Sequence, residues 1–186
     1  MTKEQYHDLQ EDYIQHVLEY VKDNGSLFPH ISIFADIINP TEEQKDKPAL
    51  IHIPIDDEYM ENEDGKEKFV EEILPLTFEE LRKKFIPHGV AWAAEAWMRL
   101  ADKDFNPSKD NWKSIPIRKE VIMISIESED GNDFFIYEMK RLGKQINSDG
   151  ELIDIVELER FDDEISKKSS TQLGGRFTGL FKKLKN

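Results

Sequence analysis

The sequence contains no cysteine among its 186 residues. Disulfide bonds, thiolate zinc sites and cysteine nucleophiles are therefore excluded. No stretch reaches the eighteen or so apolar residues that a membrane-spanning helix needs, and no apolar segment follows a basic one at the N-terminus. These features predict a cytoplasmic protein without a signal peptide.

Several motifs that mark catalytic or cofactor sites are also missing. The only adjacent glycine pair is Gly174-Gly175 near the C-terminus, where no strand precedes it, so a phosphate-binding loop is absent. There is no G-x-S-x-G motif, which excludes an esterase-type nucleophile elbow. His30 and His52 lie on predicted strands, but their spacing matches no metal motif. The sequence therefore indicates no catalytic residue, no metal ligand and no cofactor, and it favours a protein that is not an enzyme.

Basic residues are scarce and unevenly placed. The last twenty residues hold six Lys and Arg and no Asp or Glu, so the net charge of -14 leaves -20 on residues 1–166. We therefore divide the chain into an acidic domain, 1–166, and a basic tail, 167–186. An acidic surface argues against direct binding of nucleic acid by the domain, because a phosphate backbone attracts Lys and Arg. The acidic charge has two possible roles: it keeps the protein soluble, or it mimics a polyanion and binds a basic surface.

Helical periodicity appears in two regions. Residues 2–23 carry an apolar stripe at steps of three and four, with a capping box at Thr2 and Gln5 and a stop signal at Asn24-Gly25. Residues 66–86 read as two short helices or one helix kinked at Pro75, with a second capping box at Thr77 and Glu80. The acidic stretch 56–65 between strands and helix reads as a solvated loop.

Six segments read as strands. They alternate apolar and polar residues or are apolar on both faces, and the last three are joined by the turn-forming sequences SEDGN and NSDG. The predicted strands are 30–39, 49–55, 90–100, 117–127, 133–145 and 151–161. The order predicts an α+β domain: one antiparallel or mixed sheet of about six strands, ending in a β-meander, with helices mainly on one face.

The segment Ala94-Glu95-Ala96-Trp97-Met98, followed by a polar loop with Pro107-Ser108 and then by Arg118-Lys119-Glu120-Val121, resembles a pattern in uncharacterised bacterial and phage proteins. The resemblance covers about residues 48–140. It implies a strand at 90–100 and the α+β class, and it carries no known activity.

Two groups of residues are candidates for a functional site. If strands 90–100 and 117–127 pair, one group forms a charged cluster beside a tryptophan. This cluster is either a ligand site or an ion-pair ladder that fixes the register of the strands. Its members are Glu95, Trp97, Arg99, Arg118 and Glu120.

The second group lies in the tail, after the polar linker 169–175. On a helix, its four apolar residues form one stripe flanked by lysines, a pattern typical of a helix that docks into a groove of a protein partner or lies on an anionic membrane. Its members are Phe177, Leu180, Phe181, Leu184, Lys182 and Lys183. Packing of the same stripe against the chain's own acidic domain is the alternative. The leading hypothesis is a non-enzymatic accessory or assembly protein that docks to a protein partner through this tail. The alternatives are a small-ligand-binding protein or an enzyme that uses the sheet-face site around Trp97, Arg99 and Arg118, and membrane attachment through the tail.

Overall fold

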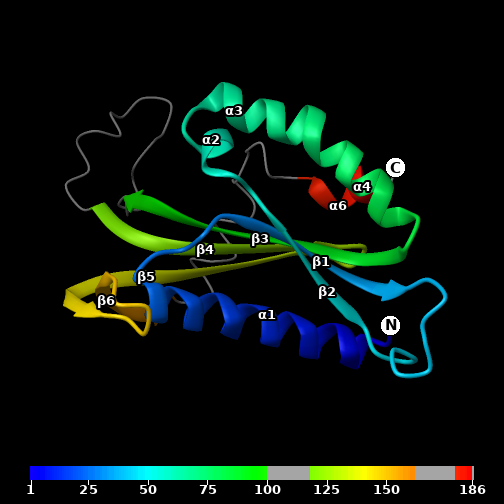
Figure 1. Cartoon of the computed structure of the whole chain (residues 1–186), viewed down its shortest axis with the longest axis horizontal. Helices are drawn as coiled ribbons and strands as arrows, with labels where there is room; N and C mark the ends of the chain where they lie inside the picture. Colours follow the sequence, from blue (N-terminus) through cyan, green and yellow to red (C-terminus); the bar gives the residue numbers. More distant parts are fainter. Residues whose placement is uncertain (100–117, 162–178, 186) are drawn as a thin grey trace, which may run out of the picture.

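The structure is a computed structural model that describes residues 1–99, 118–161 and 179–185. It contains one six-stranded antiparallel sheet in the order β2-β1-β3-β4-β5-β6. Helix α1 covers one face, and α2, α3, α4 and α6 gather on the other (Figure 1). The α+β class and the C-terminal meander are confirmed. Most helical segments share one face as expected, although the longest helix lies on the opposite face.

Helix α1 (Lys3–Asn24) begins and ends where its sequence predicts. The Thr2 hydroxyl oxygen accepts a hydrogen bond from the N–H of Gln5, and the Gln5 side-chain oxygen accepts one from the N–H of Thr2. Gly25 closes the helix in the left-handed region at φ 72°, which favours glycine. Tyr13, Val17 and Val21 are fully buried against the sheet, whose apolar side chains on this face form the larger core.

Strands β1 (His30–Ile37) and β2 (Ala49–Pro54) form the hairpin at one edge. After β2 the polypeptide crosses one face of the sheet as a series of helical segments. These segments start earlier in the sequence than predicted. The acidic stretch is not a loop: it forms α2 (Asp57–Met60) and the start of α3 (Glu63–Lys68). The Asn62 side chain caps α3 by accepting the N–H of Gly65 at 2.8 Å, a local signal that outweighs the repulsion between acidic neighbours.

The helix continues through Pro75 without a break. A π-helical segment, η1 (Phe69–Ile73), joins α3 to α4 (Leu74–Arg82). This wider turn accommodates a proline, which has no N–H and whose ring crowds the preceding turn of a regular α-helix. The predicted capping box at Thr77 is wrong, because the Thr77 hydroxyl lies inside the helix and donates to the Ile73 carbonyl.

The other four strands form the rest of the sheet. They are β3 (Phe85–Arg99), β4 (Arg118–Ser128), β5 (Gly131–Ile146) and β6 (Leu152–Arg160). The strand reading of the alanine-rich segment is confirmed, and β3 starts earlier than expected because α4 ends at Arg82. Over the described ranges, no helix combines the length and the apolar character needed to cross a membrane.

Candidate functional site

The basic tail ends in a short helix, α6 (Leu180–Lys185), that lies on the domain beside α4 (Figure 1). Its apolar side chains are buried: Leu180 is 0% exposed, Leu184 1% and Phe181 7%. They join the core that α4, η1, β1 and β3 build on this face. Phe177 lies outside the described residues. The three described residues of the stripe are therefore packed within the chain, which is the alternative that its pattern left open.

The N-terminal end of α6 is held by a buried carboxylate. Glu127, on β4, is only 3% exposed, and it accepts the N–H of Gly179 at 2.8 Å and of Phe181 at 3.0 Å. A buried carboxylate requires partners of this kind, because leaving it unpaired costs several kcal/mol. Strand β4 thus presents one charged residue inside an apolar surface, and α6 satisfies it.

The C-terminal end of α6 is held by a cation. Arg82, the last residue of α4, donates from Nη1 to the carbonyl of Leu184 at 2.9 Å and to that of Lys183 at 3.4 Å. Carbonyls at a helix C-terminus have no partner within the helix and carry partial negative charge. An anion at the first turn and a cation at the last therefore match the polarity of α6.

Two of the three lysines of α6 pair with carboxylates of the domain, and the third is exposed to solvent. Lys183 pairs with Glu71 on η1 at 2.6 Å, and Lys185 pairs with Glu129 in the turn between β4 and β5. Lys182 is exposed. The basic charge of α6 is thus partly balanced by the acidic domain. We call the surface bounded by Glu71, Arg82, Glu127 and Glu129 the α6 groove.

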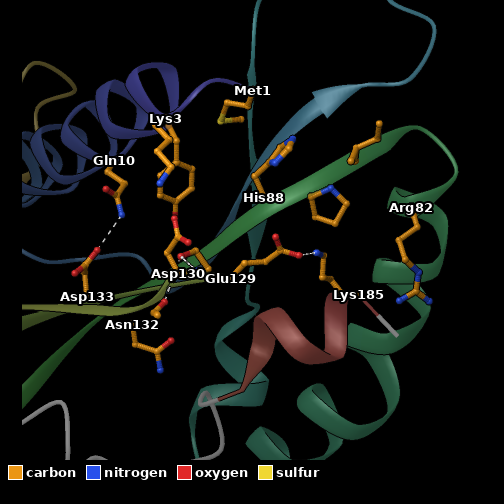
Figure 2. A pocket seen from close by; sticks show the side chains of 15 residues that line it. Met1, Lys3, Gln10, Arg82, His88, Glu129, Asp130, Asn132, Asp133 and Lys185 are labelled. Carbon is orange, nitrogen blue, oxygen red and sulfur yellow. Dashed lines mark hydrogen bonds and ion pairs between the residues drawn. The ribbon is translucent and has the colours of Figure 1, made fainter.

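A cleft of about 790 Å³ adjoins the end of α6 (Figure 2). One wall comes from α1, with Lys3, Tyr6 and Gln10. The other comes from the β4–β5 turn and the start of β5, where Asp133 accepts a hydrogen bond from Gln10 at 3.3 Å. The Tyr6 hydroxyl is buried in the wall of the cleft, and burial raises the pKa of this group. Figure 2 shows Lys185 and Glu129 meeting at the edge, so α6 contributes to the cleft.

The predicted cluster on the sheet is only partly assembled. Strands β3 and β4 pair as expected, which places Trp97 opposite Glu120 and Arg99 opposite Arg118. The side chains of Arg99 and Arg118 lie outside the described residues. Trp97 is 62% exposed.

The cation that binds the carboxylates of this cluster is Arg141, on β5. It forms two hydrogen bonds with Glu120, at 2.9 and 2.6 Å, reaches Asp154 at 2.6 Å and lies 3.6 Å from Glu95. It also donates to the carbonyl of Gly25, and Glu95 accepts the N–H of Leu27. Burial raises the pKa of Glu95 despite these partners. The cluster fastens the loop after α1 to the sheet.

Three histidines gather between α1 and the β1–β2 hairpin. The ring of His52 lies 5.6 Å from that of His16 and 5.5 Å from that of His30, beside a cavity of about 320 Å³. His52 is hydrogen-bonded to Ser32, and His30 to the Phe28 carbonyl. Within the described parts of the chain, no group of three or more His, Asp or Glu is arranged to hold a metal ion.

Sequence reasoning missed Arg82, Glu127 and Arg141. One signal was present for Glu127: it shares a face of β4 with Val121, so alternation predicts a buried carboxylate there. Nothing local marks Arg82 or Arg141, because their partners are distant in sequence. Comparison of the chain with protein-family models, with curated proteins and with solved structures gives no match.

Proposed function

We propose that this chain is a non-enzymatic interaction protein, acting in the cytoplasm in an accessory or assembly role, and that α6 is its docking helix. The observation that supports the proposal most directly is the anchoring of α6 at both ends, by Glu127 and by Arg82. Three buried apolar side chains between these anchors reproduce the helix-in-groove mode of peptide recognition. The resemblance to bacterial and phage proteins is compatible with such a role.

The size of α6 makes its docking reversible. A six-residue helix is not stable alone, so it folds only when it binds. Burial of each large apolar side chain contributes about 1.5–3 kcal/mol. Ordering each residue costs about 1–2 kcal/mol, so gain and cost are of similar size. We therefore expect α6 to leave the α6 groove often enough to meet a partner.

A partner that binds the apolar stripe must compete with the α6 groove. This gives an experiment with opposite expectations for two variants. In a pull-down from the native host, deletion of residues 169–186 should abolish recovery of the partner. Glu127→Gln, which weakens docking within the chain but leaves every tail side chain unchanged, should increase recovery.

A matched control is Glu120→Gln, a carboxylate on the same strand that does not touch α6 but binds Arg141. It should leave recovery unchanged. Equal recovery by the full chain and by the deletion variant would refute the proposal.

Membrane attachment through the tail needs the same stripe, whose residues Leu180, Phe181 and Leu184 are buried here. Co-sedimentation with anionic vesicles should therefore be weak for the wild type and should increase with Glu127→Gln if the tail binds lipid. Absence of pelleting for both would exclude this alternative.

The cleft in Figure 2 supports a second candidate, binding of a small polar ligand, because it holds about 790 Å³ between a wall with Lys3 and a wall with Asp133. A thermal-shift screen of zwitterionic compounds on the wild type and on Asp133→Asn tests it. A shift that is lost in the variant would favour this function. The cluster around Trp97 is the other surface that the sequence offers as a ligand site. A change in the fluorescence of Trp97 on addition of the compound would report binding there.

A further inference from the structure

We infer that the α6 groove is itself a receptor: when α6 leaves, the α6 groove binds a lysine-flanked amphipathic helix of a partner protein. This inference deepens the proposed function and rests on it in one respect, namely that α6 is released in the native chain. The occupant is identified by the contacts that α6 makes, one position at a time.

The floor of the α6 groove selects apolar side chains at three positions. Leu180, Phe181 and Leu184 pack in one buried cluster with Leu74 and Phe78. Phe78 is 0% exposed and Leu74 1% while α6 is in place. Release of α6 opens this apolar surface to water, which is unfavourable, so a replacement with the same spacing is favoured.

The two ends of the α6 groove select the direction of the helix. Without α6, the Glu127 carboxylate, which is 3% exposed when α6 is in place, loses two N–H donors. Arg82 likewise loses two carbonyl acceptors. Unpaired charges at partly buried sites are costly, and only a helix whose N-terminus faces Glu127 satisfies both.

The rim of the α6 groove selects lysines. Glu71 binds the lysine that precedes the last apolar residue, and Glu129 binds the one that follows it. The recognised pattern is therefore two adjacent apolar residues, any residue, lysine, a third apolar residue and lysine. A strongly acidic domain, with -20 on residues 1–166, favours a basic partner segment over an acidic one.

The experiment uses the full chain and a fluorescent synthetic peptide with the sequence of residues 176–186. Leu180→Asp with Leu184→Asp in the chain removes its own helix from the α6 groove and leaves the α6 groove intact. Anisotropy titration should show that the peptide binds this opened variant at least ~10-fold more tightly than the wild type, whose α6 groove is occupied. A peptide carrying the same two substitutions should not bind either protein.

Two further variants guard against misfolding and against non-specific attraction. Lys183→Glu with Lys185→Glu opens the α6 groove by charge reversal instead of by loss of apolar contact, and circular dichroism shows whether each variant keeps its fold. Adding Glu127→Gln to either opened variant should weaken peptide binding at least ~10-fold.

Three results would overturn the inference. They are equal binding to wild type and opened variants, no binding to folded opened variants, and a stable wild-type dimer that the substitutions in α6 abolish. The last result would assign the α6 groove to the helix of a second copy. Because the opened variants do not need spontaneous release of α6, the peptide titration can succeed where the pull-down fails, and the two hypotheses remain separable.

Discussion

The buried carboxylate of Glu127 accepts the N–H of Phe181 across 54 residues of sequence, at 3.0 Å. Glu127 is a charged residue of the β4 face that also carries Val121, Met123 and Ser125, and this bond joins it to the first turn of α6. It connects the acidic domain to the basic tail through backbone atoms, not through a salt bridge. The basic tail is therefore attached to the acidic domain by a specific hydrogen bond as well as by opposite charge.

Glu127→Gln tests how much this contact stabilises the chain. An amide oxygen can accept one of the two N–H groups, but the amide nitrogen then faces the other donor. We expect the free energy of unfolding to fall by about 1–3 kcal/mol. Hydrogen exchange of the amides in α6 should also accelerate, as measured by mass spectrometry.

Glu129→Gln is the matched control, because Glu129 binds Lys185 at an exposed position. Exposed ion pairs contribute about 0–1 kcal/mol, so the stability of this variant should remain close to that of the wild type. Equal losses for both variants would show that Glu127 has no special role.

Gly89 on β3 allows Tyr6 of α1 to approach the sheet. A Cβ at this position would lie 2.6 Å from the Tyr6 hydroxyl oxygen and 3.0 Å from Cδ2 of Phe34. Gly89→Ala should therefore destabilise the chain by about 1–3 kcal/mol, as overpacking does. Urea denaturation measures the change.

Combining Gly89→Ala with Tyr6→Leu supplies the internal control for this contact. Because leucine removes the ring that the new methyl group meets, the two losses should add to more than the loss in the double variant. Strict additivity would mean that the methyl group is accommodated elsewhere.

Arg141 neutralises three carboxylates on β3, β4 and β6. Arg141→Met would leave Glu95 and Glu120 without this cation, and Asp154 with only the longer contact to Lys144 at 3.8 Å, so we expect a loss of about 1–3 kcal/mol at pH 7. Lowering the pH toward 5 should restore part of that loss, because like charges raise carboxylate pKa values in the folded state and protonation then favours folding. Lys140→Met, which removes only an exposed pair with Glu159, should show no such recovery.

Much of the fold was predictable because its signals are local. The capping box of α1, the stop at Gly25 and the turns of the β4–β5–β6 meander are written in neighbouring residues, and all appear in the structure. The error at residues 56–65 is also local: the acidic composition suggested a loop, whereas Asn62 caps a helix there.

The site was less predictable because its contacts are distant. Glu127 was missed, and although alternation places it on the same face of β4 as Val121, nothing in the sequence says that residue 181 satisfies its carboxylate. In the same way, Arg141 lies 3.6 Å from Glu95 and binds Glu120 because β5 lies beside β4, a consequence of sheet order and not of spacing. The apolar stripe of the tail was visible, whereas the surface that covers it depends on tertiary structure.

His30 and His52 should make the stability of the chain depend on pH. Burial and neighbouring imidazoles lower the pKa values of His30 and His52, so the folded chain favours their neutral forms. In the unfolded chain they titrate near pH 6.5. Their contribution to stability is therefore complete above about pH 7, and it is lost as the pH falls through 6.5 toward the lower folded values.

Urea denaturation at pH 7.5 and pH 5.5 measures this effect, and His30→Gln should reduce the fall in the free energy of unfolding between the two. Among the described residues, the groups that face His30 are His16, His52 and Tyr13, and none of them is a carboxylate that could compensate a second charge. His7→Gln is the control, because His7 is exposed on α1 and lies 3.3 Å from Glu11. If both variants lose stability on acidification as steeply as the wild type, carboxylates elsewhere cause the fall and the cluster does not.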